Sequence, residues 1–149
     1  MRPQGSPSRD REKGGEGRLS TVYYRKAKLS AGDRDRMKEY METAMEKGIT
    51  AIKNFDSWTA YYNMACDLSV LNRLIEMEGP LVIISGKGDF SAMGAKEEIF
   101  EFLRKAFAQK PALVVHSRTD SDLQWLKERH ADEFYALVGR VYDANHGIL

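Results

Sequence analysis

Apolar residues recur with a period of about 3.6 residues in four stretches of the chain, which predicts four amphipathic helices. These helices cover residues 33–47, 57–77, 95–109 and 120–144. Residues that can cap a helix precede the first two, namely Ser30 or Asp33 and then Asp56 or Ser57. Residues 48–55 fit both the helical and the alternating pattern, and we interpret them as a helix end or a loop.

Three shorter segments have the apolar pattern of β-strands. Residues 21–29 alternate in character, and the three basic side chains among them indicate an edge strand. Residues 81–85 and 112–116 are continuous apolar runs, typical of strands that are buried in a parallel sheet. A predicted helix follows each of them. The C-terminal half of the chain therefore predicts a strand–helix–strand–helix unit with a right-handed crossover.

The predicted fold class is α/β, with a small three-stranded mixed sheet, about four helices and a C-terminal βαβα unit. Residues 19–149 would form a single domain, because a chain of 149 residues has the usual size of one domain. Residues 1–18 contain Gly, Ser, Pro and charged residues but no aromatic or branched apolar side chain. We expect a flexible basic tail there, since such a segment buries too little surface to fold.

Composition excludes several classes of protein. Hydrophobic residues make up 42% and charged residues 30% of the chain, as in globular domains rather than collagen or disordered chains. No apolar run approaches the roughly 18 residues of a membrane-spanning helix, and because the N-terminus is polar we expect no secretory signal. The single cysteine, Cys66, cannot form an internal disulfide. We therefore expect a protein of the cytoplasm or another reducing intracellular compartment.

Charge is distributed unevenly, although the net charge is only +1. Residues 1–38 carry eleven Lys or Arg against five Asp or Glu, whereas residues 39–149 carry twelve against seventeen. A basic arm and first strand would suit an acidic partner or a nucleic acid, because cations contact phosphates and aromatic rings stack on bases. A solvated tail is the simpler alternative. The candidate residues for this contact are Arg9, Arg11, Lys13, Arg18, Tyr23, Tyr24, Arg25, Lys26 and Lys28.

A glycine-rich segment follows the second predicted strand and is a candidate ligand site. Ligands of open α/β sheets bind beyond the carboxyl ends of the strands, where the N–H groups of helix N-termini attract anions. Two predicted loops would lie there, with Lys87 and Arg118 adding positive charge. Neither the P-loop pattern nor the dinucleotide fingerprint is complete, so a turn without a ligand is the alternative. The candidate phosphate-binding residues are Gly86, Lys87, Gly88, Asp89, Ser91, His116, Ser117 and Arg118.

Catalytic and metal-binding patterns are incomplete in this sequence. No G-x-S-x-G elbow is present, and the three histidines lack the H-x-x-x-H spacing of a helical metal site. We therefore assign no catalytic residue and no metal ligand, and no cofactor is predicted. Enzymatic activity is left undecided, with the balance against it.

Three functions fit these patterns. The first is a small intracellular non-catalytic binding or assembly subunit, whose basic arm and first strand hold a larger partner, either protein or nucleic acid. The second is a module or small enzyme that binds a phosphate-bearing ligand of nucleotide or coenzyme A type through residues 86–91. The third is a protein–protein adaptor. The first is preferred because no catalytic set is complete, and the sequence does not predict an oligomeric state.

Overall fold

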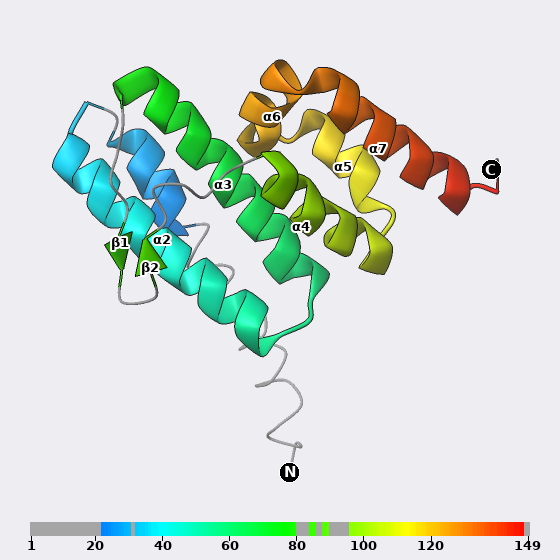
Figure 1. The fold of residues 1–149 in the computed structure, drawn as a ribbon, viewed down its shortest axis with the longest axis horizontal. Helices are drawn as coiled ribbons and strands as arrows, with labels where there is room; N and C mark the ends of the chain where they lie inside the picture. The colour runs from blue at the N-terminus through cyan, green and yellow to red at the C-terminus, as the bar shows by residue number, and fades with distance from the viewer. Residues whose placement is uncertain (1–21, 31, 80–83, 86–87, 90–95, 148–149) are drawn as a thin grey trace, which may run out of the picture.

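Helices make up nearly all of the described chain (Figure 1). The structure is a computed structural model, and it describes residues 22–30, 32–79, 84–85, 88–89 and 96–147. A helical segment at residues 22–29 is followed by α2 (Arg34–Asn54), α3 (Trp58–Glu78), α4 (Lys96–Gln109), α5 (Leu113–Thr119), the 3-10 helix η1 (Ser121–Leu123), α6 (Gln124–Arg129) and α7 (Ala131–Asn145). Two strands of two residues each, β1 (Ile84–Ser85) and β2 (Gly88–Asp89), form an antiparallel pair.

The predicted α/β class is therefore wrong, because the described residues form an all-α fold. The first predicted strand, residues 21–29, is helical over residues 22–29. Tyr24 and Ala27, three positions apart, are fully buried, whereas Val22 and Leu29 are 46% and 88% exposed. This spacing places the two buried residues on one face of a helix. The apparent alternation arose from apolar residues that the fold leaves in solvent.

The other two predicted strands fail for a related reason. Residues 112–116 belong mostly to α5, in which Leu113, Val114 and Ser117 are buried and Val115 is exposed. Ile84 and Ser85 pair antiparallel with β2 rather than in a parallel sheet, and residues 81–83 lie outside the described chain. A continuous apolar run of four residues fits a buried strand and a short buried helix equally well.

The first three predicted helices are confirmed as α2, α3 and α4, and two predicted caps are present. Asp33 accepts a hydrogen bond from the Arg36 backbone N–H before α2, and Ser57 accepts one from the Thr59 N–H before α3. The α2 helix continues through residues 48–54, because Ile49 and Ala51 extend its buried stripe. These caps bond backbone donors that the first turn of a helix leaves unpaired.

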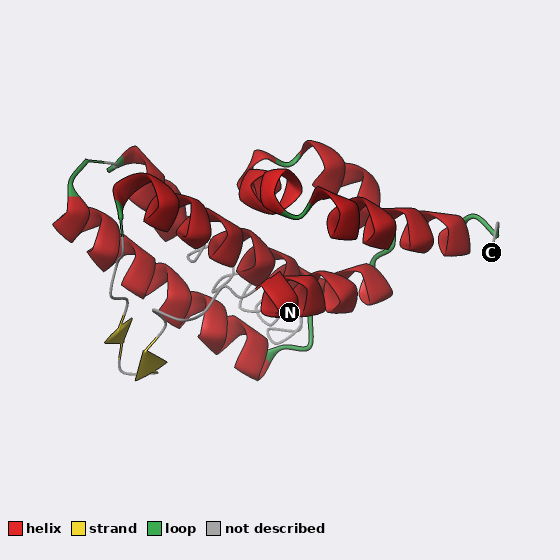
Figure 2. Cartoon of the chain, turned by 45° about the horizontal axis from the view of Figure 1, so that its top comes forward, coloured by secondary structure: helices red, strands yellow, loops and turns green. Residues whose placement is uncertain are grey.

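Helix α3 is the centre of the molecule (Figures 1 and 2). It forms a hairpin with α2 through residues 55–57, and it also packs against α4, η1 and α6. Every residue from Met64 to Leu71 is buried. A helix buried on all sides must be surrounded by other elements, so α3 organises the core.

The predicted helix 120–144 is divided into η1, α6 and α7, with an interruption at His130. Two ion pairs connect α6 to α3, Arg73 with Glu128 at 2.7 Å and Arg129 with Glu76 at 2.8 Å. No helix among the described ranges has both the length and the apolar character needed to cross a membrane. The proposed tail, residues 1–18, lies outside these ranges, and the proposed domain 19–149 stays a prediction.

Candidate functional site

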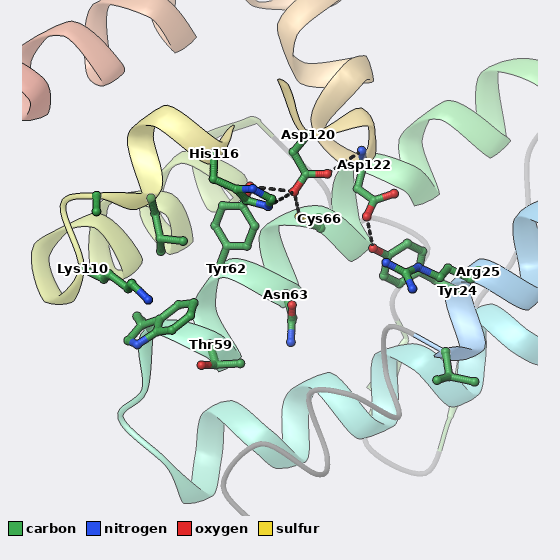
Figure 3. Close-up of a pocket in the computed structure, with 14 residues that line it drawn as sticks. Tyr24, Arg25, Thr59, Tyr62, Asn63, Cys66, Lys110, His116, Asp120 and Asp122 are labelled. Atoms are coloured by element: carbon green, nitrogen blue, oxygen red, sulfur yellow. Dashed lines mark hydrogen bonds and ion pairs between the residues drawn. The ribbon is translucent and has the colours of Figure 1, made fainter. Parts of the chain in front are cut away.

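An open pocket of about 720 Å³, which we call the first groove, lies between three parts of the fold (Figure 3). Residues 22–25 form one side, the face of α3 from Trp58 to Cys66 forms the base, and the α4–α5 turn with α5 forms the other side. The α5–η1 junction closes it with Asp120 and Asp122. The lining residues thus come from segments far apart in the sequence.

Two buried tyrosines bind the two carboxylates of this junction. The Tyr62 hydroxyl donates to Asp120 Oδ2 at 2.7 Å, and the Tyr24 hydroxyl donates to Asp122 Oδ2 at 2.5 Å. Asp120 also caps η1, because its Oδ1 accepts a hydrogen bond from the Asp122 backbone N–H at 3.0 Å. Both carboxylates therefore have structural partners, and hydrogen bonds to charged acceptors are among the strongest in proteins.

Two further side chains contact Asp120. His116 Nε2 lies 3.3 Å from Asp120 Oδ2, and the ring of His116 packs at 5.8 Å from that of Tyr62. The Cys66 thiol lies 3.9 Å from the same oxygen. This carboxylate is consequently surrounded by three different side chains from α3 and α5, those of Tyr62, Cys66 and His116.

Burial controls protonation in this cluster. Removal from water raises the pKa of the Tyr24 and Tyr62 phenols, and the neighbouring Cys66 and carboxylates raise it further. Burial also raises the pKa of the Cys66 thiol, with Asp120 and Asp122 acting in the same direction. All three groups therefore stay protonated at neutral pH and act as hydrogen-bond donors.

Cys66, Asp120 and Asp122 are the described residues that could hold a metal ion. Their ligand atoms all lie within 4.8 Å of one another. Sequence reasoning missed this grouping, because Cys66 is separated from the two aspartates by more than fifty residues. The Asp120–x–Asp122 spacing was the only local signal. Each carboxylate already binds a phenol, and Lys28 approaches Asp122 Oδ1 at 3.4 Å, so the negative charge is compensated by protein groups.

The open side of the first groove has polar and cationic side chains. Thr59 and Asn63 lie one turn apart on α3, on the same face as Tyr62 and Cys66 (Figure 3). Lys110 lies over the Trp58 ring, with its Nζ 4.2 Å from the ring centroid. Arg25 lies at the opposite end, and within the described chain it forms no ion pair. The rim is thus positive at both ends.

The predicted phosphate-binding residues are only partly described. Gly86, Lys87 and Ser91 lie outside the described residues, and Gly88 and Asp89 form β2. The three others lie in helix α5 rather than in a loop after a parallel strand. His116 lines the first groove, Arg118 does not, and the Ser117 hydroxyl donates to the Val114 carbonyl at 2.8 Å. The described residues therefore lack the pair of strand-end loops on which this expectation rested.

The predicted partner-binding residues also divide into two groups. Arg9, Arg11, Lys13 and Arg18 lie outside the described residues. The others, Tyr23, Tyr24, Arg25, Lys26 and Lys28, lie on helical segment 22–29 rather than on the face of a strand.

This segment does not present its aromatic rings for stacking on bases. The Tyr24 ring is buried, and the Lys26 ammonium lies over the rings of Tyr23 and Tyr40. Of the predicted set on this segment, Tyr24 and Arg25 line the first groove.

Comparison with protein-family models, with curated proteins and with solved structures finds no match to this chain. The inference about function therefore depends on the geometry of the first groove. Its two main features are the base of the first groove, where tyrosines hold the carboxylates, and its rim, where polar and cationic groups face solvent.

Proposed function

We propose that this protein is a non-catalytic binding or assembly subunit that holds an extended segment of a larger protein in the first groove. The observation that carries the proposal is the half-buried Asn63 amide at the middle of the groove. Within the described chain this amide has no hydrogen-bond partner, although it can donate and accept. A peptide group needs both a donor and an acceptor, so one asparagine side chain can bind it.

The surroundings of Asn63 support the same function. Trp58, Tyr62 and Leu113 offer apolar and aromatic surface within the groove. Aromatic side chains with a few polar groups are typical of surfaces that bind proteins. Arg25 and Lys110 would attract an acidic partner segment, and the basic residues of the arm would add to this attraction.

The protonation of the groove favours binding over nucleophilic catalysis. A cysteine nucleophile reacts as the thiolate, and burial keeps Cys66 as the thiol. Asp120 and Asp122 are engaged by phenols, which occupy the oxygens that a general base would need.

A peptide selection tests the proposal. A phage-displayed library of random peptides is selected against the full chain, and the affinity of the enriched peptides is measured by fluorescence anisotropy. Asn63→Ala should weaken binding about fivefold, the effect of one net hydrogen bond of about 1 kcal/mol. Asn54→Ala, which removes an exposed amide at the end of α2, is the matched control and should leave affinity unchanged.

Two results would contradict the proposal. One is that the enriched peptides bind the Asn63→Ala protein as tightly as the unaltered chain. The other is that no peptide is enriched while single-stranded oligonucleotides bind in a salt-sensitive way.

A further inference from the structure

A second groove of about 570 Å³ runs between α4 and α7. It shares no lining residue with the first groove, and the two adjoin at the α4–α5 turn, where Lys110 lines the first and Pro111 the second. Its residues had no part in the function proposed above. The second groove is therefore an independent feature of the surface.

The shape of the second groove fits a helix. Phe107 and Leu137, both nearly fully buried, contribute to its apolar base. Ala108 on α4 and Ala144 on α7 are exposed, and both line it. Helix axes approach to within about 8–10 Å when the side chains at the contact are small. Because small alanine side chains line both sides of the second groove, a third helix can pack between α4 and α7.

The charged side chains that line the second groove are both positive. Arg104 of α4 and Arg140 of α7 line it, both are exposed, and no carboxylate lines it. Neither arginine forms an ion pair within the described ranges. Glu133 is paired with Lys96, which lowers the pKa of Glu133 most strongly, and Arg104 adds a smaller effect in the same direction. Two guanidinium groups, one from each helix, are thus available to an anionic occupant.

We propose that the second groove docks an amphipathic helix of a protein partner, with its apolar face between α4 and α7 and its acidic side chains opposite Arg104 and Arg140. Docking of an amphipathic helix in an apolar groove is a common mode of recognition. Charge argues against a second copy of this chain meeting groove to groove, because each pair of arginines would face the other pair. The occupant is therefore an acidic helix from a different protein.

Two labelled model peptides test this inference on the full-length protein. Both are fluorescein-labelled helical 18-mers with leucine along one face; one has glutamate along the opposite face and the other has glutamine at the same positions. Fluorescence anisotropy should show binding of the glutamate peptide, weaker binding of the glutamine peptide, and loss of affinity as salt is raised.

Variants of the protein locate the contact. Arg104→Gln combined with Arg140→Gln should weaken binding of the glutamate peptide by about two- to fivefold for each charge removed. The control, Lys53→Gln combined with Lys105→Gln, removes the same charge outside the groove, since the Lys105 ammonium lies over the Tyr61 ring. Ala144→Phe should block binding at an exposed position where a larger side chain does not disturb the core. Circular dichroism checks that each variant is folded.

Each of four results would overturn the inference. Equal binding of the two peptides would remove the role of charge, and an equal loss in the lysine control would show attraction to net charge alone. Groove-dependent binding of anionic phosphatidylglycerol vesicles without binding of the peptide would make the occupant a membrane surface. A dimer in sedimentation that Ala144→Phe dissociates would make it a second copy. Asn63→Ala, which tests only the first groove, should leave the helical peptide bound.

Discussion

The Tyr24 hydroxyl lies 2.5 Å from the Asp122 carboxylate, although the two residues are 98 positions apart in the chain. This hydrogen bond connects the first described helix to the 3-10 helix that precedes α6. Tyr62 makes the equivalent contact from α3 to Asp120. Two phenol–carboxylate pairs thus fix the α5–η1 junction against the rest of the fold, and they close the base of the first groove.

Removal of either phenol should destabilise the protein. Tyr24→Phe or Tyr62→Phe removes a hydrogen-bond donor from a largely buried carboxylate, which costs about 1–3 kcal/mol of the free energy of unfolding. Urea denaturation followed by circular dichroism measures this change. Tyr61→Phe is the matched control, because its hydroxyl binds the exposed Asp56, and we expect little effect from it. Equal decreases in the free energy of unfolding for all three variants would show that the buried phenol–carboxylate pairs stabilise the protein no more than the exposed pair does.

The same pairs predict alkaline instability. The pKa of Tyr24 and Tyr62 is raised above the ordinary value of about 10 by burial, so the folded state holds these protons when the unfolded state has released them. The stabilisation is complete below pH 10 and is lost as pH rises beyond it, by about 1.4 kcal/mol per pH unit for each phenol. Absorbance at 295 nm should show both phenols ionising together with unfolding. Their ionisation while the circular dichroism spectrum is still native would contradict the prediction.

Lys127 should stabilise the C-terminal end of α5. Its ammonium donates to three backbone carbonyls, those of Ser117, Arg118 and Asp120, at 2.8 to 3.1 Å. Lys127→Met keeps the length of the side chain but leaves these acceptors without their donor, and we expect a loss of about 1–3 kcal/mol. Lys105→Met, at an exposed position, controls for the loss of charge. Hydrogen exchange should also become faster in α5, and unchanged exchange there would argue against the role.

The Cys66–Asp120–Asp122 cluster should not require a metal ion for stability. Each carboxylate already accepts a hydrogen bond from a phenol, and the Lys28 ammonium lies 3.4 Å from Asp122 Oδ1. Dialysis against EDTA should therefore leave Tm unchanged, as measured by differential scanning calorimetry. A fall in Tm that zinc ion restores, and that Cys66→Ser abolishes, would show instead that the cluster binds a metal.

The long helices could be predicted from the sequence because their signals are local. The 3.6-residue period of apolar positions in α2, α3 and α4 extends over several turns, and Asp33 and Ser57 cap the first two of them. Periodicity of that length distinguishes a helix from a strand without knowledge of any partner. The sequence likewise determined that Cys66 has no second cysteine to pair with among these 149 residues. It also determined that the excess of basic residues lies toward the N-terminus.

Only the tertiary structure decided the short elements and the candidate site. Residues 22–29 and 112–116 have too few positions to establish a period, so burial of Tyr24 and Leu113 against distant helices determined their conformation. Asp120 and Tyr62 form one pair because η1, which Asp120 caps, packs against α3, and no spacing in the sequence encodes that contact. Side-chain chemistry and long periods are local properties of a chain. Which face becomes buried, and which distant residues meet there, depends on how the helices pack.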